Sequence, residues 1–117
     1  MYADLFFDFP GASNIVDAAS RAYSAIGVKD FVQRESENYI EGVYFTAESG
    51  DTQIEIAMVD DEDAGDLRFW LSLDSSLEGA PFERLVECLA KGQLLSAGAK
   101  VARVYDFGKK TMKMVGY

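Results

Sequence analysis

Apolar residues recur at every second position in several short segments of this 117-residue chain, and this period restricts each such segment to a half-buried β-strand. The pattern is clearest at the start, where Ala3, Leu5 and Phe7 alternate with polar or aromatic neighbours. Gly-containing turns follow several of the segments and end them. We predict strands over residues 3–9, 39–48, 52–59 and 67–73, and one or two more within residues 101–107 and 111–115.

Two other segments have the 3.6-residue period of a helix. From Ile15, apolar residues follow at i+4, i+7 and i+11, with Ser13 placed as the N-cap and Gly27 as the C-cap. A second helix begins near Pro81, a favoured first helical position, and ends at Gly98. Each helix therefore offers one apolar face that a sheet can bury.

The predicted order is strand, helix, three strands, helix, then one or two strands. Helices separated from an antiparallel meander are typical of an α+β two-layer sandwich. We therefore expect an antiparallel sheet of about five strands with two helices on one face, ferredoxin-like or an elaboration of that fold, in the order βαβββαβ(β). The length suits a single domain that spans residues 1–117.

Charge is unevenly distributed along the chain, whose formal net charge is −9. Residues 35–66 contain eleven acids and no Lys or Arg. The first 98 residues carry six bases and 19 acids, a net −13, whereas the last 19 residues carry five bases and one acid, a net +4. A negative surface repels the phosphates of nucleic acids and attracts basic proteins. We expect a basic protein as the partner and no direct binding of nucleic acid.

The first eight residues carry acids within an apolar run and no basic segment, so we expect neither a secretion signal nor a membrane anchor. No stretch has the length of a transmembrane span. The single cysteine, Cys88, has no partner for an internal disulfide, and its helical spacing among leucines predicts a packed side chain. We expect a cytoplasmic protein, monomeric or weakly dimeric, that does not bind membranes.

The residue types that most catalysis needs are missing from the chain. It contains no His, the usual general base and the commonest transition-metal ligand. Zinc and iron sites need clusters of Cys or His. The acidic turn at residues 60–66 fails the calcium-loop pattern, because Ala64 and Leu71 fall at two of the ligand positions. We therefore predict no catalytic residue, no metal site and no cofactor.

The outward face of the predicted sheet combines aromatic and acidic side chains. Tyr2, Phe6 and Trp70 point to that face, together with Asp4 and Asp8. The pattern leaves two alternatives for Phe6 and Trp70. They form the apolar centre of a protein interface, or a helix or the C-terminal hairpin covers them.

In size, acidity and expected α+β build, the chain resembles the small immunity proteins of bacterial toxin systems, such as those paired with contact-dependent growth inhibition toxins. The resemblance implies a non-enzymatic inhibitor that binds one cognate toxin, often a basic nuclease. Carboxylates can replace substrate phosphates in a cationic cleft, and opposite potentials accelerate association. The predicted contact residues are Glu41, Tyr44, Glu48, Glu55, Asp60, Asp61, Glu62, Asp63, Asp66 and Trp70, with Tyr44 and Trp70 as aromatic anchors.

Two other functions fit the same sequence. A phage-encoded mimic of nucleic acid would also be acidic, although the net +4 of the last 19 residues argues against uniform mimicry. The second alternative is a regulatory domain that binds a small molecule and has a ferredoxin-like sheet. A toxin inhibitor should associate more slowly with its partner as salt rises, whereas a regulatory domain should gain thermal stability from its ligand.

Overall fold

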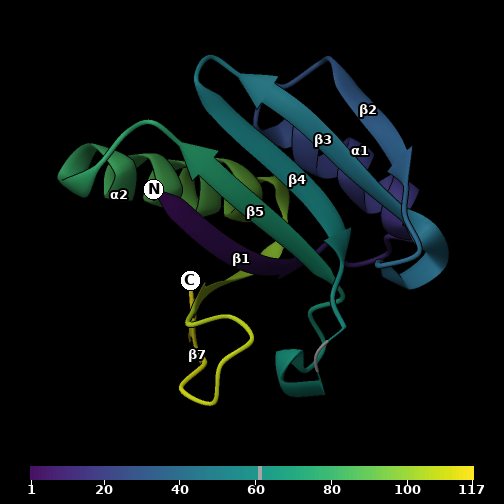
Figure 1. Cartoon of the computed structure of the whole chain (residues 1–117). Coiled ribbons are helices and arrows are strands. Elements are labelled where there is room, and N and C mark those ends of the chain that lie inside the picture. Colours follow the sequence, from purple (N-terminus) through teal and green to yellow (C-terminus); the bar gives the residue numbers. More distant parts are fainter. Residues whose placement is uncertain (61) are drawn as a thin grey trace.

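The computed structural model describes residues 1–60 and 62–117, and these residues form one antiparallel sheet of seven strands (Figure 1). The strands are β1 Tyr2–Asp8, β2 Phe31–Glu35, β3 Val43–Ser49, β4 Thr52–Met58, β5 Phe69–Ser75, β6 Lys100–Tyr105 and β7 Lys113–Gly116. They lie in the order β2-β3-β4-β5-β1-β6-β7. The first strand of the chain is therefore an internal strand, between β5 and β6, which both follow it by more than sixty residues.

The expectation of about five strands in a ferredoxin-like order is wrong. Four strands, not three, separate the two helices in the described residues, and the order is βαββββαββ. The strand that the sequence analysis missed is β2, which forms one edge of the sheet. All of its residues except Phe31 are exposed. An edge strand with little buried surface does not need the apolar alternation that located the other strands.

Two helices cover one face of the sheet and enclose the main hydrophobic core. The helical segments are α1 Ile15–Ala25, α2 Gly79–Glu87, the π-helical continuation of α2 over Cys88–Leu94, and 3-10 turns at Ile40–Gly42, Glu62–Ala64 and Leu95–Ala97. In Figure 1, α1 lies behind β3 and β4, and α2 lies behind β5. The buried Tyr23 hydroxyl donates to the Ile54 carbonyl at 2.7 Å, which fixes α1 against β4. Among the described residues, no helix combines the length and apolar character that a membrane crossing requires.

Two local details of the helices differ from the sequence expectation. The N-cap of α1 is Asn14, whose side-chain oxygen accepts a hydrogen bond from the Asp17 amide at 2.9 Å. Ser13 lies one residue earlier, and its amide donates to the Asp17 carboxylate at 3.1 Å. Cys88 is exposed, so the prediction of a packed side chain is wrong. The helix changes to π-helical winding at Cys88, and the next residue, Leu89, points into the core instead.

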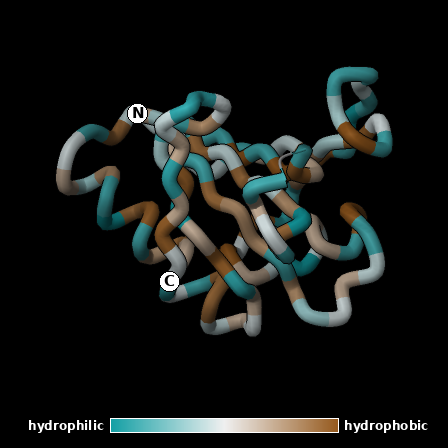
Figure 2. The backbone as a smooth tube through the Cα atoms, turned by 90° about the horizontal axis from the view of Figure 1, so that it is seen from below, coloured by the Kyte–Doolittle hydropathy of each residue, from teal (hydrophilic) through white to brown (hydrophobic). Residues whose placement is uncertain are grey.

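A second, smaller hydrophobic core lies on the opposite face of the sheet. Phe6 is fully buried there, whereas its neighbours Leu5 and Phe7 point into the main core, so β1 is buried on both faces. The buried members of this second core are Phe6, Ala64, Leu67, Ala102 and Val104. In Figure 2 the hydrophobic stretches run mainly through the interior of the fold, and the loops that project from it are mostly hydrophilic or intermediate.

The C-terminal segment, defined as residues 106–117, covers this second core. The Phe107 ring stacks on Trp70 with centroids 4.9 Å apart, and it meets Phe6 edge-on at 5.4 Å. In Figure 1 this segment, in yellow, lies below β1. Of the two alternatives for Phe6 and Trp70, coverage by the C-terminal hairpin is therefore the one observed.

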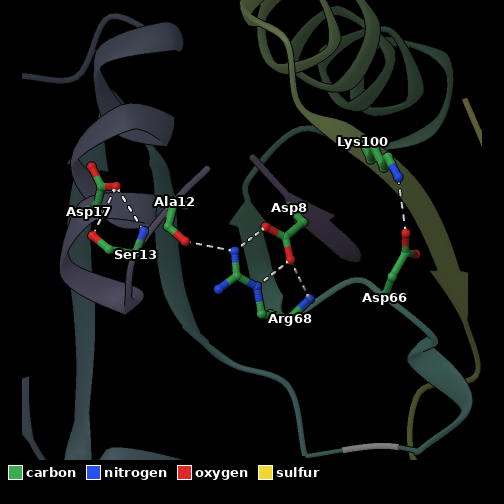
Figure 3. Close-up of polar contacts among 7 residues, drawn as sticks. All are labelled: Asp8, Ala12, Ser13, Asp17, Asp66, Arg68 and Lys100. Carbon is green, nitrogen blue, oxygen red and sulfur yellow. Dashed lines mark hydrogen bonds and ion pairs between the residues drawn. The ribbon is translucent and has the colours of Figure 1, made fainter. Parts of the chain in front are cut away.

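A buried carboxylate anchors the loop between β4 and β5 (Figure 3). Asp8, at the end of β1, accepts two hydrogen bonds from the Arg68 guanidinium at 2.7 and 2.8 Å and one from the Arg68 amide at 3.1 Å. The same guanidinium donates to the Ala12 carbonyl at 2.9 Å. Nearby, Lys100 and Asp66 form an ion pair at 3.0 Å between two exposed side chains. The Asp8–Arg68 pair thus fixes the point where the loop enters β5.

We expect Asp8→Ala to lower the free energy of unfolding by about 2 kcal/mol, because it removes three charge-assisted hydrogen bonds and leaves Arg68 without its partner. Urea unfolding followed by circular dichroism measures the change. Asp66→Ala is the matched control, since its ion pair with Lys100 is solvent-exposed and should contribute little. Equal destabilisation by the two variants would contradict the assignment of Asp8 as the anchor.

Candidate protein-binding face

The C-terminal segment covers only part of the sheet face that lies opposite the helices. The part formed by β2, β3 and β4 is open to solvent and contains a hollow of about 490 Å³. We call this surface the β2–β4 face. Its lining residues are Asp30, Val32, Arg34, Tyr44, Thr46, Ala47, Glu48, Gln53 and Glu55.

Strand alternation and register determine which side chains meet on the β2–β4 face. Phe45 points into the main core, so its strand neighbours Tyr44, Thr46 and Glu48 lie on the opposite, open side. Thr46 pairs directly with Glu55 of β4. Glu55 is therefore the diagonal neighbour of both Tyr44 and Glu48, and such neighbours lie about 7–8 Å apart. The register thus places two carboxylates and one tyrosine around Thr46.

The carboxylates of this face lack partners of opposite charge. Within the described residues, neither Glu48 nor Glu55 forms an ion pair or a hydrogen bond through its carboxylate. Arg34 donates from Nε to the Thr46 hydroxyl at 3.3 Å and likewise forms no ion pair with them. With Asp30, the lining holds three acids and one base, which gives it a net charge of −2.

Two stacked tyrosines border the face at the end where β3 begins. The rings of Tyr39 and Tyr44 have centroids 4.6 Å apart and an interplanar angle of 25°. Partial burial raises the pKa of Tyr39, and the negative charge of Glu55 and the neighbouring Tyr44 raise it further. The Glu55 carboxylate therefore lies close enough to the tyrosine pair for its charge to raise the pKa of Tyr39. An aromatic surface beside an unpaired carboxylate favours cationic side chains.

The structure brings together three of the ten predicted contact residues. Tyr44, Glu48 and Glu55 all line the hollow of the β2–β4 face. Glu41 lies apart from them, in the turn before β3, where it lines a second hollow of about 410 Å³ with Glu35 and other residues of that turn. The acids between residues 35 and 66 are thus divided among several surfaces.

The acidic loop between β4 and β5 is a separate surface, and none of its described acids lines the β2–β4 face. Its exposed acids are Asp60, Glu62, Asp63 and Asp66. The hydrogen bond from Lys100 lowers the pKa of Asp66 and holds this carboxylate toward β6. Asp61 lies outside the described residues. A role for these loop acids in binding a partner stays a prediction.

Trp70 is packed within the second core and is only half-buried. Its ring stacks on Phe107, and its indole N–H donates to the Asp4 carboxylate at 2.9 Å. Of the two predicted aromatic anchors, Tyr44 is the one that lines the open hollow. This packing does not test the prediction that Trp70 contacts a partner. The Phe107 ring already covers one face of the Trp70 ring.

Six of the lining residues were not predicted from the sequence, and three of them, Asp30, Val32 and Arg34, lie close together in the chain. All three belong to β2 or to the residue before it, and that strand was not recognised. The available signal was the adjacent aromatic and β-branched pair Phe31-Val32, two residue types that are enriched in strands. In the structure Phe31 packs on Tyr23 with ring centroids 4.7 Å apart, and Val32 points to the open side.

No family model matches the chain, and comparisons with curated proteins and with solved structures find no match either. Within residues 1–60 and 62–117, no three or more Cys, Asp or Glu side chains are grouped so that they could hold a metal ion. The chemistry of the β2–β4 face therefore has to be inferred from its own residues.

Asp4 lies on the covered part of the sheet, beside Trp70, and replacing it with Asn tests the effect of its burial. Burial raises the pKa of Asp4, against smaller lowering effects from the Trp70 hydrogen bond and the Arg103 charge. A raised pKa means that Asp4 destabilises the fold once the pH rises through its folded-state value. We expect Asp4→Asn, which still accepts from Trp70, to raise the melting temperature at pH 7.

The gain should disappear below pH 3.8, the ordinary pKa of Asp, because Asp4 is then protonated in both states. Thermal unfolding at several pH values measures this difference. Asp30→Asn, the same change at an exposed position, is the control and should not reproduce it. A gain that is independent of pH would contradict the explanation by burial.

Proposed function

We propose that this chain is a non-enzymatic inhibitor that docks a basic partner protein onto its β2–β4 face, in the manner of an immunity protein that neutralises a bacterial toxin. The observation that carries the proposal is the placement of Glu48 and Glu55, with no ion-pair partner among the described residues, beside Tyr44 on an open, hollowed part of the sheet. Aromatic side chains within a charged rim are common in protein interfaces.

The charge of the chain supports a basic partner. The net charge of −9 attracts a cationic protein over long range and accelerates encounter. On contact, Glu48 and Glu55 gain partners that they lack in the free protein, so their desolvation is compensated by new ion pairs. An acidic surface that occupies a cationic cleft also blocks access of an anionic substrate, which is how such a protein inhibits.

The experiment uses the protein encoded directly upstream of the gene for this chain, because immunity genes follow the genes of their toxins. We expect expression of that protein to stop growth of a bacterial host, and co-expression of this chain to restore it. Surface plasmon resonance should show one-to-one binding, with an association rate that falls as salt rises.

The double variant Glu48→Lys, Glu55→Lys should slow association roughly tenfold or more and abolish the restored growth. Glu78→Lys, Glu87→Lys is the matched control, because it changes the net charge equally at exposed positions of the helical layer. Circular dichroism confirms that both variants fold, and Glu55→Gln replaces the double variant if that one does not. No binding by the upstream protein, or equal effects of the two variants, would contradict the proposal.

A further inference from the structure

The surroundings of Thr46 define what kind of side chain the β2–β4 face can receive. Glu55 lies directly opposite Thr46, and Tyr44 and Glu48 lie two residues away from it on the same strand and the same side. Val32 of β2 is the other direct neighbour of Thr46. The position above Thr46 is therefore bordered by two carboxylates, one aromatic ring, one aliphatic side chain and the guanidinium of Arg34, whose Nε donates to the Thr46 hydroxyl.

An arginine side chain matches this arrangement better than any other cation. A guanidinium is planar and presents five N–H donors, so it can bridge two carboxylates that a compact ammonium reaches only one at a time. Its flat face also stacks on tyrosine. The diagonal separation of Glu48 and Glu55, about 7–8 Å between strand positions, leaves room for such a group between them.

We propose that the β2–β4 face binds an arginine of a basic protein segment, with the guanidinium held between Glu48 and Glu55 and stacked on Tyr44. This inference rests on the proposed function, which names the face but not the residue that it recognises. The stack of Tyr39 on Tyr44 supports it, because the second ring fixes the orientation of the first.

The chain's own Arg34 provides a test in which two substitutions should change the affinity in opposite directions. Its guanidinium already lies above this surface, where Nε donates to the Thr46 hydroxyl at 3.3 Å, but it reaches no carboxylate within ion-pair distance. It therefore repels an incoming arginine while adding nothing to the binding of one. Removing the charge of Arg34 should strengthen binding of a cationic segment, and removing that of Glu55 should weaken it.

The probe is the blocked peptide acetyl-Gly-Arg-Gly-Arg-Gly-amide, compared with its lysine and citrulline analogues in a titration followed by ¹H–¹⁵N NMR. Citrulline keeps the shape of arginine without its charge. We expect saturable shifts at Tyr44, Thr46, Glu48 and Glu55, about threefold tighter binding of the arginine peptide than of the lysine peptide, and no binding of the citrulline peptide.

Two variants complete the test. Glu55→Gln should weaken binding of the arginine peptide about threefold, and Arg34→Gln should tighten it by a similar factor. Arg84→Gln and Glu87→Gln, at exposed positions of α2, are the matched controls and should leave the affinity unchanged. Equal binding of arginine and lysine, shifts centred on residues 62–66, or weaker binding in Arg34→Gln would each overturn the inference.

These results separate the inference from the proposed function. If the upstream protein binds the β2–β4 face but the peptides do not discriminate arginine, only the arginine site falls. If the peptides bind as expected and the upstream protein does not, the inhibitor role falls and the arginine site remains.

Discussion

Burial of the first strand on both faces is the constraint on which the rest of this structure depends. β1 lies inside the sheet, between β5 and β6, and Leu5 and Phe7 point toward the helices while Phe6 points to the other side. A strand that is apolar on both faces needs a layer on each side. The helices supply one layer. The other comes from the C-terminal segment, through Phe107, and from the loop between β4 and β5, through Ala64 and Leu67. Because the C-terminal segment stacks on β5 and β1 but does not line the β2–β4 face, the part of the second side that β2, β3 and β4 form remains in contact with water.

The division of this side into a covered and an open part also divides its polar groups. One line of paired residues crosses the sheet from Asp4 through Ser72 and Glu55 to Thr46. At the covered end, Asp4 is bound by the Trp70 indole. At the open end, Glu55 has no hydrogen-bonding or ion-pair partner among the described residues. The same strand pairing thus produces a satisfied carboxylate in the second core and an available one on the exposed surface.

Sequence patterns located most elements because their residues alternate strictly, as in β4, where Ile54 and Ile56 are buried and Gln53 is exposed. They failed where burial is weak, as in β2, and where a local hydrogen bond decides between adjacent candidates, as at Asn14. The coverage of Phe6 depends on Phe107, which is distant in sequence, so no local pattern predicts it. For the site, the charge count identified an acidic region but did not separate strand acids such as Glu55 from loop acids, because only the register shows which of them share a surface.

The most direct test of this account is hydrogen–deuterium exchange of the chain with and without the upstream-encoded protein. Backbone amide hydrogens exchange more slowly in segments that a bound partner covers. The account predicts added protection in the residues of β2, β3 and β4, at 31–35, 43–49 and 52–58, with none in α2 or the C-terminal segment. Protection confined to residues 62–66, to α2 or to residues 106–117 would show that the partner binds elsewhere and would contradict the central claim.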